Sequence, residues 1–294
     1  MQKVAFIGAG VMGKNMIRNF MKKNIDISFY TRTKEKALDL IDEGAHWRDS
    51  VKECVLDKKV IITMVGYPSD IEEIYLGKDG IIENAAEGSY LIDMTTTDPK
   101  LAKKLFDKSK EKGLHFMDAP VSGSDIRAVD GTLTIMVGGE LKDFEACYPI
   151  FNCLGNIIIY EGPSGSGQHT KMANQIAISG AISGVCEALY YANKVGLDET
   201  KTLITISTGA AASFQMENMA PKILDEEYEA GFFIKHFVKD MEIAIKEAEN
   251  KNIDLPVLAR VLKNYQSLEK QGYGDLGIQA LYKFYEDEDE DKDK

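Results

Sequence analysis

The pattern of hydrophobic and polar positions changes once along the chain. From residue 3 to about 160, short apolar runs alternate with segments of helical period, which predicts a parallel sheet with crossover helices. The predicted strands are Lys3–Ile7, Ile27–Tyr30, Lys59–Met64, Tyr90–Met94 and His115–Asp118, then Leu133–Val137 and Ile157–Tyr160 around a helix that opens near Glu140. We therefore expect an α/β domain in the first half of the chain.

After residue 162 the strand pattern ends. The glycine-rich segment Gly162–Gly167 leads into a helical stretch, roughly Gln168–Lys194, that is apolar on every face and is therefore expected to be buried. Further helices are predicted at Glu199–Thr208, Met216–Leu224, Lys235–Asn250, Pro256–Gln271 and Asp275–Tyr285. The pattern predicts an α/β domain at residues 1–162 and an all-α domain at 163–294, joined by the long helix. The acidic tail at 286–294 is expected to be frayed.

Composition narrows the class of partner. The 294 residues carry a net charge of −12, which leaves no basic face for nucleic acid. The four cysteines show no C-x-x-C spacing and indicate reduced thiols. The apolar run at residues 4–7 is too short for a signal peptide or a membrane span. We expect a cytoplasmic protein that binds small ligands and neither nucleic acid nor membrane.

A glycine motif directly follows the first predicted strand and opens a helix. It reads Gly8-Ala9-Gly10-Val11-Met12-Gly13. In this context G-x-G-x-x-G permits a tight turn, close approach of a pyrophosphate and close packing of helix on strand. The helix N-terminus adds free N–H groups and a positive dipole end. The sequence predicts a dinucleotide-binding Rossmann domain; a glycine turn without a ligand is the alternative.

The end of the second predicted strand bears on the choice of cofactor. NAD-selective domains carry an acid there, whereas this chain has Thr31, Arg32 and Thr33, with Lys36 one turn later. Arg32 can bind a 2′-phosphate and stack on adenine, and Thr33 can also cap the next helix. We predict that NADP(H) is favoured over NAD(H). The alternative is an arginine that stacks on adenine without selecting a cofactor.

Five motifs follow one another along the chain: the glycine motif, Asp93–Thr96, Asp118–Gly123, Gly162–Asn174 and Lys239-Asp240. With these motifs in this order, the chain resembles the β-hydroxyacid dehydrogenases, which include 3-hydroxyisobutyrate dehydrogenase, tartronate semialdehyde reductase and glyoxylate/succinic semialdehyde reductases. The resemblance spans essentially the whole chain. It implies hydride transfer between a nicotinamide and a short carboxylate-bearing β-hydroxy acid. The long apolar helix and the helical second domain further suggest a homodimer or tetramer.

Lys171 is the candidate general acid and base. It is a charged side chain in an otherwise apolar helix, and burial lowers the pKa of an ammonium group toward the range in which it exchanges protons near pH 7. The alternative is a lysine that snorkels from the helix end. Asn174 at i+3 and Gln175 at i+4 share its face, so the sequence leaves open which amide contacts the substrate.

The resemblance also assigns roles at strand ends. Ser122 and Gly123 are expected to hold the substrate carboxylate, with a plain turn as the alternative, and Ser124 replaces the family's usual second glycine. Thr96 is expected near the nicotinamide ribose, or else as a helix cap. The loop residues Met64 and Val65 complete the expected cofactor contacts.

Three positions in the second half are more ambiguous. Lys239 is expected to face the cofactor with Asp240 as its partner or as a pocket wall, and an exposed helix pair is the alternative. Phe232 either closes the active site or packs in the core. His169 and His236 have no other ligand at metal spacing, so no metal is predicted.

The rival classes are a dinucleotide-binding sensor without catalysis and a phosphogluconate-type dehydrogenase. The set Ser122, Lys171 and Asn174 argues against the sensor. The short helical domain, which has no arginine cluster for a sugar phosphate, argues against the second.

Overall fold

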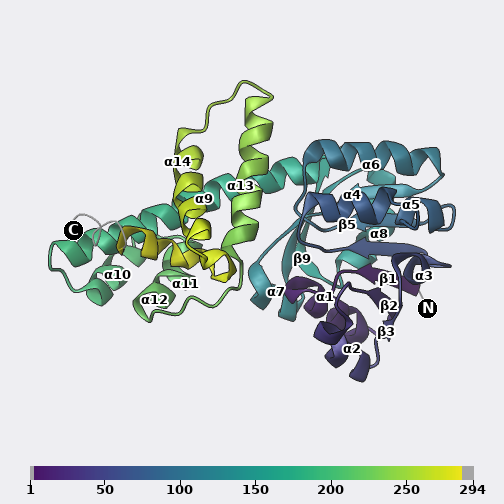
Figure 1. Ribbon diagram of the computed structural model, residues 1–294, viewed down its shortest axis with the longest axis horizontal. Coiled ribbons are helices and arrows are strands. Elements are labelled where there is room, and N and C mark those ends of the chain that lie inside the picture. Colours follow the sequence, from purple (N-terminus) through teal and green to yellow (C-terminus); the bar gives the residue numbers. More distant parts are fainter. Residues whose placement is uncertain (1–2, 287–294) are drawn as a thin grey trace. The chain divides into compact units, whose positions relative to one another are not determined.

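The computed structural model describes residues 3–286 (Figure 1). It divides into two compact units, one ending at Lys171 and the other beginning at Met172. The division falls inside the long helix α9 (Ser166–Lys194). The predicted acidic tail, apart from Glu286, lies outside the described residues.

The first unit is built on one sheet with the strand order β3-β2-β1-β4-β5-β6-β8-β7, and β9 pairs with β8. The strands are β1 (Lys3–Ile7), β2 (Asp26–Tyr30), β3 (His46–Trp47), β4 (Val60–Thr63), β5 (Tyr90–Asp93), β6 (His115–Asp118), β7 (Val121–Ser122), β8 (Leu133–Gly138) and β9 (Gly155–Gly162). The first six are parallel, as predicted for the five of them that the sequence indicated, whereas β3 was not predicted and β8 runs antiparallel to β6 and β7. The strand order reverses between β1 and β4, which is where open α/β sheets bind ligands.

Helices cover both faces of this sheet (Figure 1). Alternate residues of β1 enter two cores: Val4 and Phe6 pack with α1, whereas Ala5 and Ile7 pack with α4. The helices of this unit are α1 (Val11–Lys22), α2 (Leu38–Asp42), α3 (Val51–Val55), α4 (Pro68–Leu76), α5 (Ile81–Asn84), α6 (Pro99–Glu111), α7 (Ser124–Asp130) and α8 (Leu141–Phe151). The predicted Rossmann domain is confirmed.

The second unit is helical, as predicted, with two differences. Its helices after α9 are α10 (Glu199–Ser207), α11 (Phe214–Asn218), α12 (Ala220–Leu224), α13 (Ile234–Glu249) and α14 (Pro256–Lys270). The helix predicted at 216–224 is two helices because Pro221 cannot donate a backbone hydrogen bond and starts a new turn. The helix predicted at 275–285 is interrupted, since Ile278 N donates to Phe232 O outside any helix.

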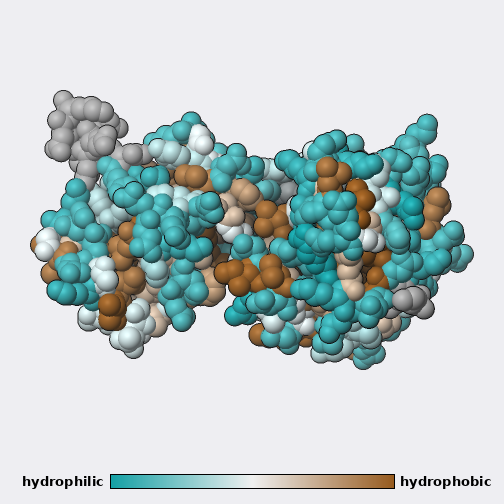
Figure 2. Space-filling model, turned by 90° about the horizontal axis from the view of Figure 1, so that it is seen from below, coloured by the Kyte–Doolittle hydropathy of each residue, from teal (hydrophilic) through white to brown (hydrophobic). Residues whose placement is uncertain are grey.

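The prediction that α9 is buried on every face is wrong for the single chain. One stripe is buried, including Gln175, Ile182 and Cys186, while Ala177 and Tyr191 on another face are exposed. Small side chains read as apolar in the sequence but can face water. Figure 2 likewise shows hydrophobic residues reaching the surface in small groups among hydrophilic ones. No helix in the described range is long and apolar enough to cross a bilayer.

Candidate active site

The glycine motif forms a tight turn followed by an open cradle. Gly8 has φ +104°, and a Cβ there would lie 2.1 Å from Met64 O; a Cβ on Gly13 would lie 2.1 Å from Gly8 O. A Cβ on Gly10 would have no atom within 4 Å, and α1 begins at Val11 without a side-chain cap. Open backbone beside uncapped N–H groups fits a pyrophosphate. The observed geometry therefore suits the dinucleotide predicted for this motif.

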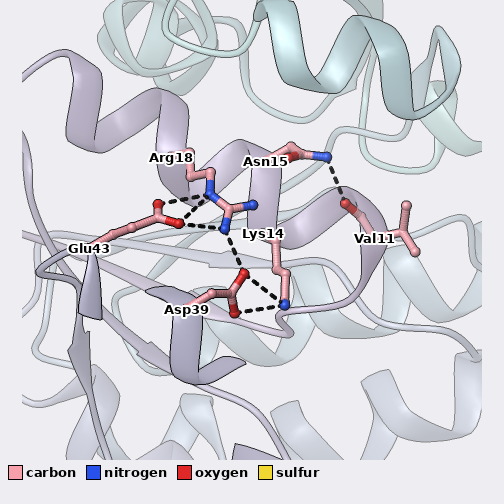
Figure 3. Close-up of polar contacts among 6 residues, drawn as sticks. All are labelled: Val11, Lys14, Asn15, Arg18, Asp39 and Glu43. Carbon is pink, nitrogen blue, oxygen red and sulfur yellow. Dashed lines mark hydrogen bonds and ion pairs between the residues drawn. The ribbon is translucent and has the colours of Figure 1, made fainter. Parts of the chain in front are cut away.

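A cluster of four charged residues, the α1–α2 charge cluster, joins the helix after this turn to the segment after β2 (Figure 3). Lys14 Nζ lies 2.8 Å from Asp39 Oδ1, and Arg18 Nη2 lies 2.6 Å from Asp39 Oδ2 and 2.6 Å from Glu43 Oε1. The hydrogen bond from Lys14 lowers the pKa of Asp39 to about 2. The cluster connects the two segments that the sequence assigns to pyrophosphate and ribose.

A carboxylate from another segment lies at the end of β2. Arg32 is 76% exposed, and its Nη1 lies 3.0 Å from Asp70 Oδ1 of α4. No carboxylate stands at this strand end in the sequence, but the fold brings one there. Thr33 occupies an N-cap position without a side-chain capping bond, so its expected cap is wrong. Thr31 is half-buried and Lys36 is exposed.

Buried polar contacts connect the ends of β4 and β5. Asp93 Oδ1 accepts hydrogen bonds from Thr63 Oγ1 at 2.8 Å and from Thr95 N at 3.0 Å, and Thr95 Oγ1 accepts one from Val65 N at 3.0 Å. Burial raises the pKa of Asp93 to about 7. These bonds order the two loops expected to contact cofactor, the one after β4 with Met64 and Val65 and the one after β5.

The first turn of α9 is attached to the same edge of the sheet. Asp118 at the end of β6 accepts hydrogen bonds from Gly165 N at 2.7 Å and from Gln168 N at 2.9 Å. The Gln168 side chain bonds to Thr95 O at 2.7 Å and to Thr97 N at 3.0 Å. A Cβ on Gly167 would lie 2.4 Å from Met136 O. We call Thr63, Asp93, Thr95, Thr97, Asp118 and Gln168 the strand-end network.

Lys171 lies one turn beyond Gln168 and is 7% exposed. A snorkelling lysine would be largely exposed, so this burial contradicts that alternative. Thr96, between two residues held by Gln168, is half-buried. It is not the cap of α6, because Asp98 accepts the capping bond from Lys100 N.

A second group of polar side chains continues along α9 and α13, within the second unit. Asn174 Nδ2 donates to Gln175 Oε1 at 2.8 Å, and Gln175 Nε2 donates to Asp240 Oδ2 at 2.6 Å. Asp240 Oδ1 lies 2.8 Å from Lys239 Nζ, and the two side chains are only 2% and 12% exposed. The alternative of an exposed pair is therefore wrong. We call these four residues the helix network.

The loop after β7 contains two residues with positive φ. Gly123 has φ +138° and Ser124 has φ +59°, a region that favours glycine. Ser122 and both of these residues are half-buried. Helix α7, which follows, is held to α1 by a 2.6 Å hydrogen bond from Asn19 Nδ2 to Ala128 O.

Three further residues singled out in the sequence are Phe232, His169 and His236. The ring of Phe232 is half-buried, with its centroid 5.5 Å from that of Phe237, so it packs against the helical core. His169 is exposed and His236 is half-buried.

Comparison with known proteins agrees with this geometry. Residues 3–162 match the family described as the NAD binding domain of 6-phosphogluconate dehydrogenase, and residues 165–285 match that described as NAD-binding of NADP-dependent 3-hydroxyisobutyrate dehydrogenase. "Probable 3-hydroxyisobutyrate dehydrogenase-like 1, mitochondrial" of Arabidopsis thaliana is 40% identical, over 95% of this chain and 84% of that protein. The chain belongs to the β-hydroxyacid dehydrogenase family.

Two bacterial proteins are also similar to this β-hydroxyacid dehydrogenase. The uncharacterized oxidoreductase YkwC of Bacillus subtilis is 53% identical, over 96% of this chain and 98% of that protein. The crystal structure of 3-hydroxyisobutyrate dehydrogenase from Salmonella typhimurium has the same fold, with a TM-score of 0.88 at 22% identity, over 96% and 99% of the two chains. The family models and the relative from Arabidopsis thaliana show that this enzyme is an NAD(P)-dependent oxidoreductase that acts on CH–OH groups.

The structure of this β-hydroxyacid dehydrogenase adds three residues to which the sequence gave no individual role: Asp70, Asp118 and Gln168. Gln168 bonds to residues more than 70 positions away, and Asp118 to residues about 50 away. No local pattern signals such pairs. The roles of Asp118 and Gln168 can be recognised only when it is known that the ends of β5 and β6 lie beside the start of α9.

Proposed function

We propose that this enzyme interconverts a short β-hydroxy acid and its semialdehyde with NADP(H), and that Lys171 is the general acid and base. The observation that carries the proposal is the burial of Lys171 one turn beyond Gln168, whose contacts attach α9 to the turn around Thr96. Burying the amine of Lys171 to 7% exposure has a desolvation cost. Proton transfer to the substrate is a function that accounts for a lysine at this position in a dinucleotide-binding enzyme.

In this proposal, the nicotinamide supplies or accepts the hydride. Lys171 accepts the hydroxyl proton during oxidation and returns it to the carbonyl oxygen during reduction. Its amine must be neutral to accept the proton and charged to donate it. The reaction therefore requires a lysine whose two protonation states are both accessible near the working pH.

Ser122, Gly123 and Asn174 bind the substrate carboxylate in this proposal. Both ends of the Gln175 carboxamide are engaged, the nitrogen with Asp240 and the oxygen with Asn174. Gln175 is also fully buried, whereas Asn174 is half-buried and has a second amide hydrogen available. We therefore assign the substrate contact to Asn174 and a supporting contact to Gln175.

The preference for NADP(H) rests on Arg32. Its exposed guanidinium can bind a 2′-phosphate through the donors that Asp70 does not occupy. Asp70 opposes this preference, because a carboxylate near the phosphate is repulsive.

We also propose that the enzyme is a homodimer or tetramer in the cytoplasm, since α9 exposes an apolar face that includes Tyr191. Sedimentation or light scattering measures the oligomeric state.

A substrate panel tests the proposed reaction. Purified enzyme is assayed with NADPH and with NADH against glyoxylate, succinic semialdehyde, tartronate semialdehyde and methylmalonate semialdehyde, and against 6-phosphogluconate in the oxidative direction. We expect turnover of at least one carboxylated aldehyde, with the lower KM for NADPH. No turnover with any compound would support the sensor, and oxidation of 6-phosphogluconate alone would support the phosphogluconate-type enzyme.

The cofactor assignment is tested by Arg32→Ala. We expect a rise in KM for NADPH equivalent to roughly 1.5–3 kcal/mol, because a charged hydrogen bond is lost, and little change for NADH. Arg260→Ala, an exposed arginine of the helical unit, is the matched control. Asp70→Asn is expected to lower KM for NADPH relative to NADH. Equal losses with both cofactors in Arg32→Ala would contradict a phosphate-reading role.

A further inference from the structure

Gln168 is a fully buried side chain that uses both ends of its carboxamide. Its Nε2 donates to Thr95 O at 2.7 Å and its Oε1 accepts from Thr97 N at 3.0 Å. One side chain thus bonds to the residue before and to the residue after Thr96. A carboxamide offers a donor and an acceptor at a fixed spacing, so the pair of bonds restrains the turn more strictly than one bond would.

The turn at residues 95–97 is also held from the sheet side. Thr95 N donates to Asp93 Oδ1, and Thr95 Oγ1 accepts from Val65 N in the loop after β4. Gln168 therefore joins α9 to a turn that is already fixed to two strands. The position of the turn is set by the sheet, and Gln168 transmits that position to the helix.

The backbone of Gln168 is fixed as well. Its N–H and that of Gly165 donate to opposite oxygens of the Asp118 carboxylate, which burial keeps away from water. With backbone and side chain both held, the first turn of α9 has little freedom to slide or rotate. Lys171 follows at i+3, on the same side of the helix as Gln168.

We propose that Gln168 is a positioning residue for the reaction, one that sets the amine of Lys171 against the turn containing Thr96. The inference rests on the proposed role of Lys171. A displacement of about 1 Å can lower a rate by on the order of 10²-fold when the reacting groups must be aligned. Gln168 acts through Lys171 and Thr96 and need not touch substrate or cofactor.

The competing explanation is that Gln168 only stabilises the first turn of α9. Gln279 provides a matched control within the described chain. It is also a buried glutamine, 3% exposed, whose Nε2 donates to two backbone carbonyls, of Glu227 at 2.9 Å and of Glu229 at 3.1 Å. It holds a loop of the helical unit. Gln279→Ala therefore reports the effect of losing such bonds outside the strand-end network.

The experiment compares Gln168→Ala, Gln168→Glu and Gln279→Ala with the wild type. We expect Gln168→Ala to lower kcat per folded molecule by roughly 10- to 100-fold, with a NADPH Kd within about threefold of the wild type, since most of the expected cofactor contacts, at the glycine motif and at Arg32, lie outside this turn. The primary isotope effect with C4-deuterated NADPH is expected to rise, because hydride transfer becomes rate-limiting. Gln168→Glu keeps the acceptor for Thr97 N but loses the donor, so its kcat should fall too. Gln279→Ala is expected to lower Tm and leave kcat within about twofold.

The inference is overturned if kcat and the isotope effect of Gln168→Ala match those of Gln279→Ala. It is also overturned if neither Gln168 variant folds, as judged by circular dichroism, because the residue would then be required for the fold itself. Normal turnover by Lys171→Ala instead refutes the proposed function, whatever Gln168 does. A defective Lys171→Ala variant with active Gln168 variants would refute only the positioning role.

Discussion

Along the sequence of α9, Lys171 follows Gln168, a member of the strand-end network, and precedes Asn174, a member of the helix network, and the two networks differ in construction. The strand-end network, on the side of Gln168, bonds mainly to backbone groups of loops fixed to the sheet. The helix network, on the side of Asn174, bonds side chain to side chain and ends in the ion pair of Lys239 and Asp240. The first is restrained by the sheet, and the second depends on rotamers and charges.

This difference suggests a division of tasks around one lysine. A network bonded to backbone keeps the position of a group constant, because backbone atoms of a sheet move little. A network of side chains can reorganise when a charged ligand arrives, since each member has alternative rotamers. We infer that changes in the strand-end network act chiefly on kcat, and changes in the helix network chiefly on KM.

The largest expected effect comes from the residue between the networks. Lys171→Ala should lower kcat by on the order of 10² or more, a typical contribution of a general acid or base, while NADPH still binds. Steady-state kinetics over a range of pH and cofactor titration measure the two effects. Turnover close to that of the wild type, with an unchanged pH profile, would show that another group transfers the proton.

Substitutions at the substrate side come next. Ser122→Ala and Asn174→Ala should each lower kcat/KM for carboxylated substrates by a factor equivalent to roughly 1.5–3 kcal/mol of transition-state stabilisation, since each removes a hydrogen bond to a charged group. The reference is an aldehyde without a carboxylate, for which little loss is expected. If both substrates lose equally, these side chains serve folding or cofactor placement.

Neutralising the helix network tests its dependence on charge. Asp240→Asn removes the negative charge that lies 2.8 Å from Lys239 Nζ but retains an oxygen that can accept from Gln175. We expect the free energy of unfolding to fall by about 1–3 kcal/mol, and KM for the acid to rise more than kcat falls. Urea denaturation and steady-state kinetics provide both quantities. A fall in kcat alone would remove the distinction between the two networks.

The last prediction is a pH dependence of stability in the strand-end network. Burial raises the pKa of Asp93 from 3.8 to about 7, so the folded protein keeps a proton that the unfolded chain releases. The resulting stabilisation is complete below pH 4 and is lost as pH rises through 7, with a slope of up to about 1.4 kcal/mol per pH unit. The difference in stability between wild type and Asp93→Asn, measured from pH 4 to 8, should show this slope. A constant difference would mean that Asp93 is already ionised across that range.

The sequence predicted the fold well where patterns are long. Seven strands and the helical second unit follow from periodicity, whereas β3 and β7 contain two residues each and produce no pattern. The site was predictable where one segment carries the chemistry, as at Gly8–Gly13. The partners Asp70 for Arg32 and Gln168 for Thr95 come from distant segments, and only the strand order brings such residues together.

The glycine-rich segment before α9 has a consequence for exchanging modules between relatives. It resembles a flexible linker, yet Gly165 N is bonded to Asp118 and Gly167 fits against the backbone of β8 with no room for a side chain. A chimera joined at residue 162 would pair the first turn of α9 with a foreign sheet. A junction beyond Lys171 would carry that turn with its native sheet, and we expect such recombinants to tolerate a substituted helical unit better.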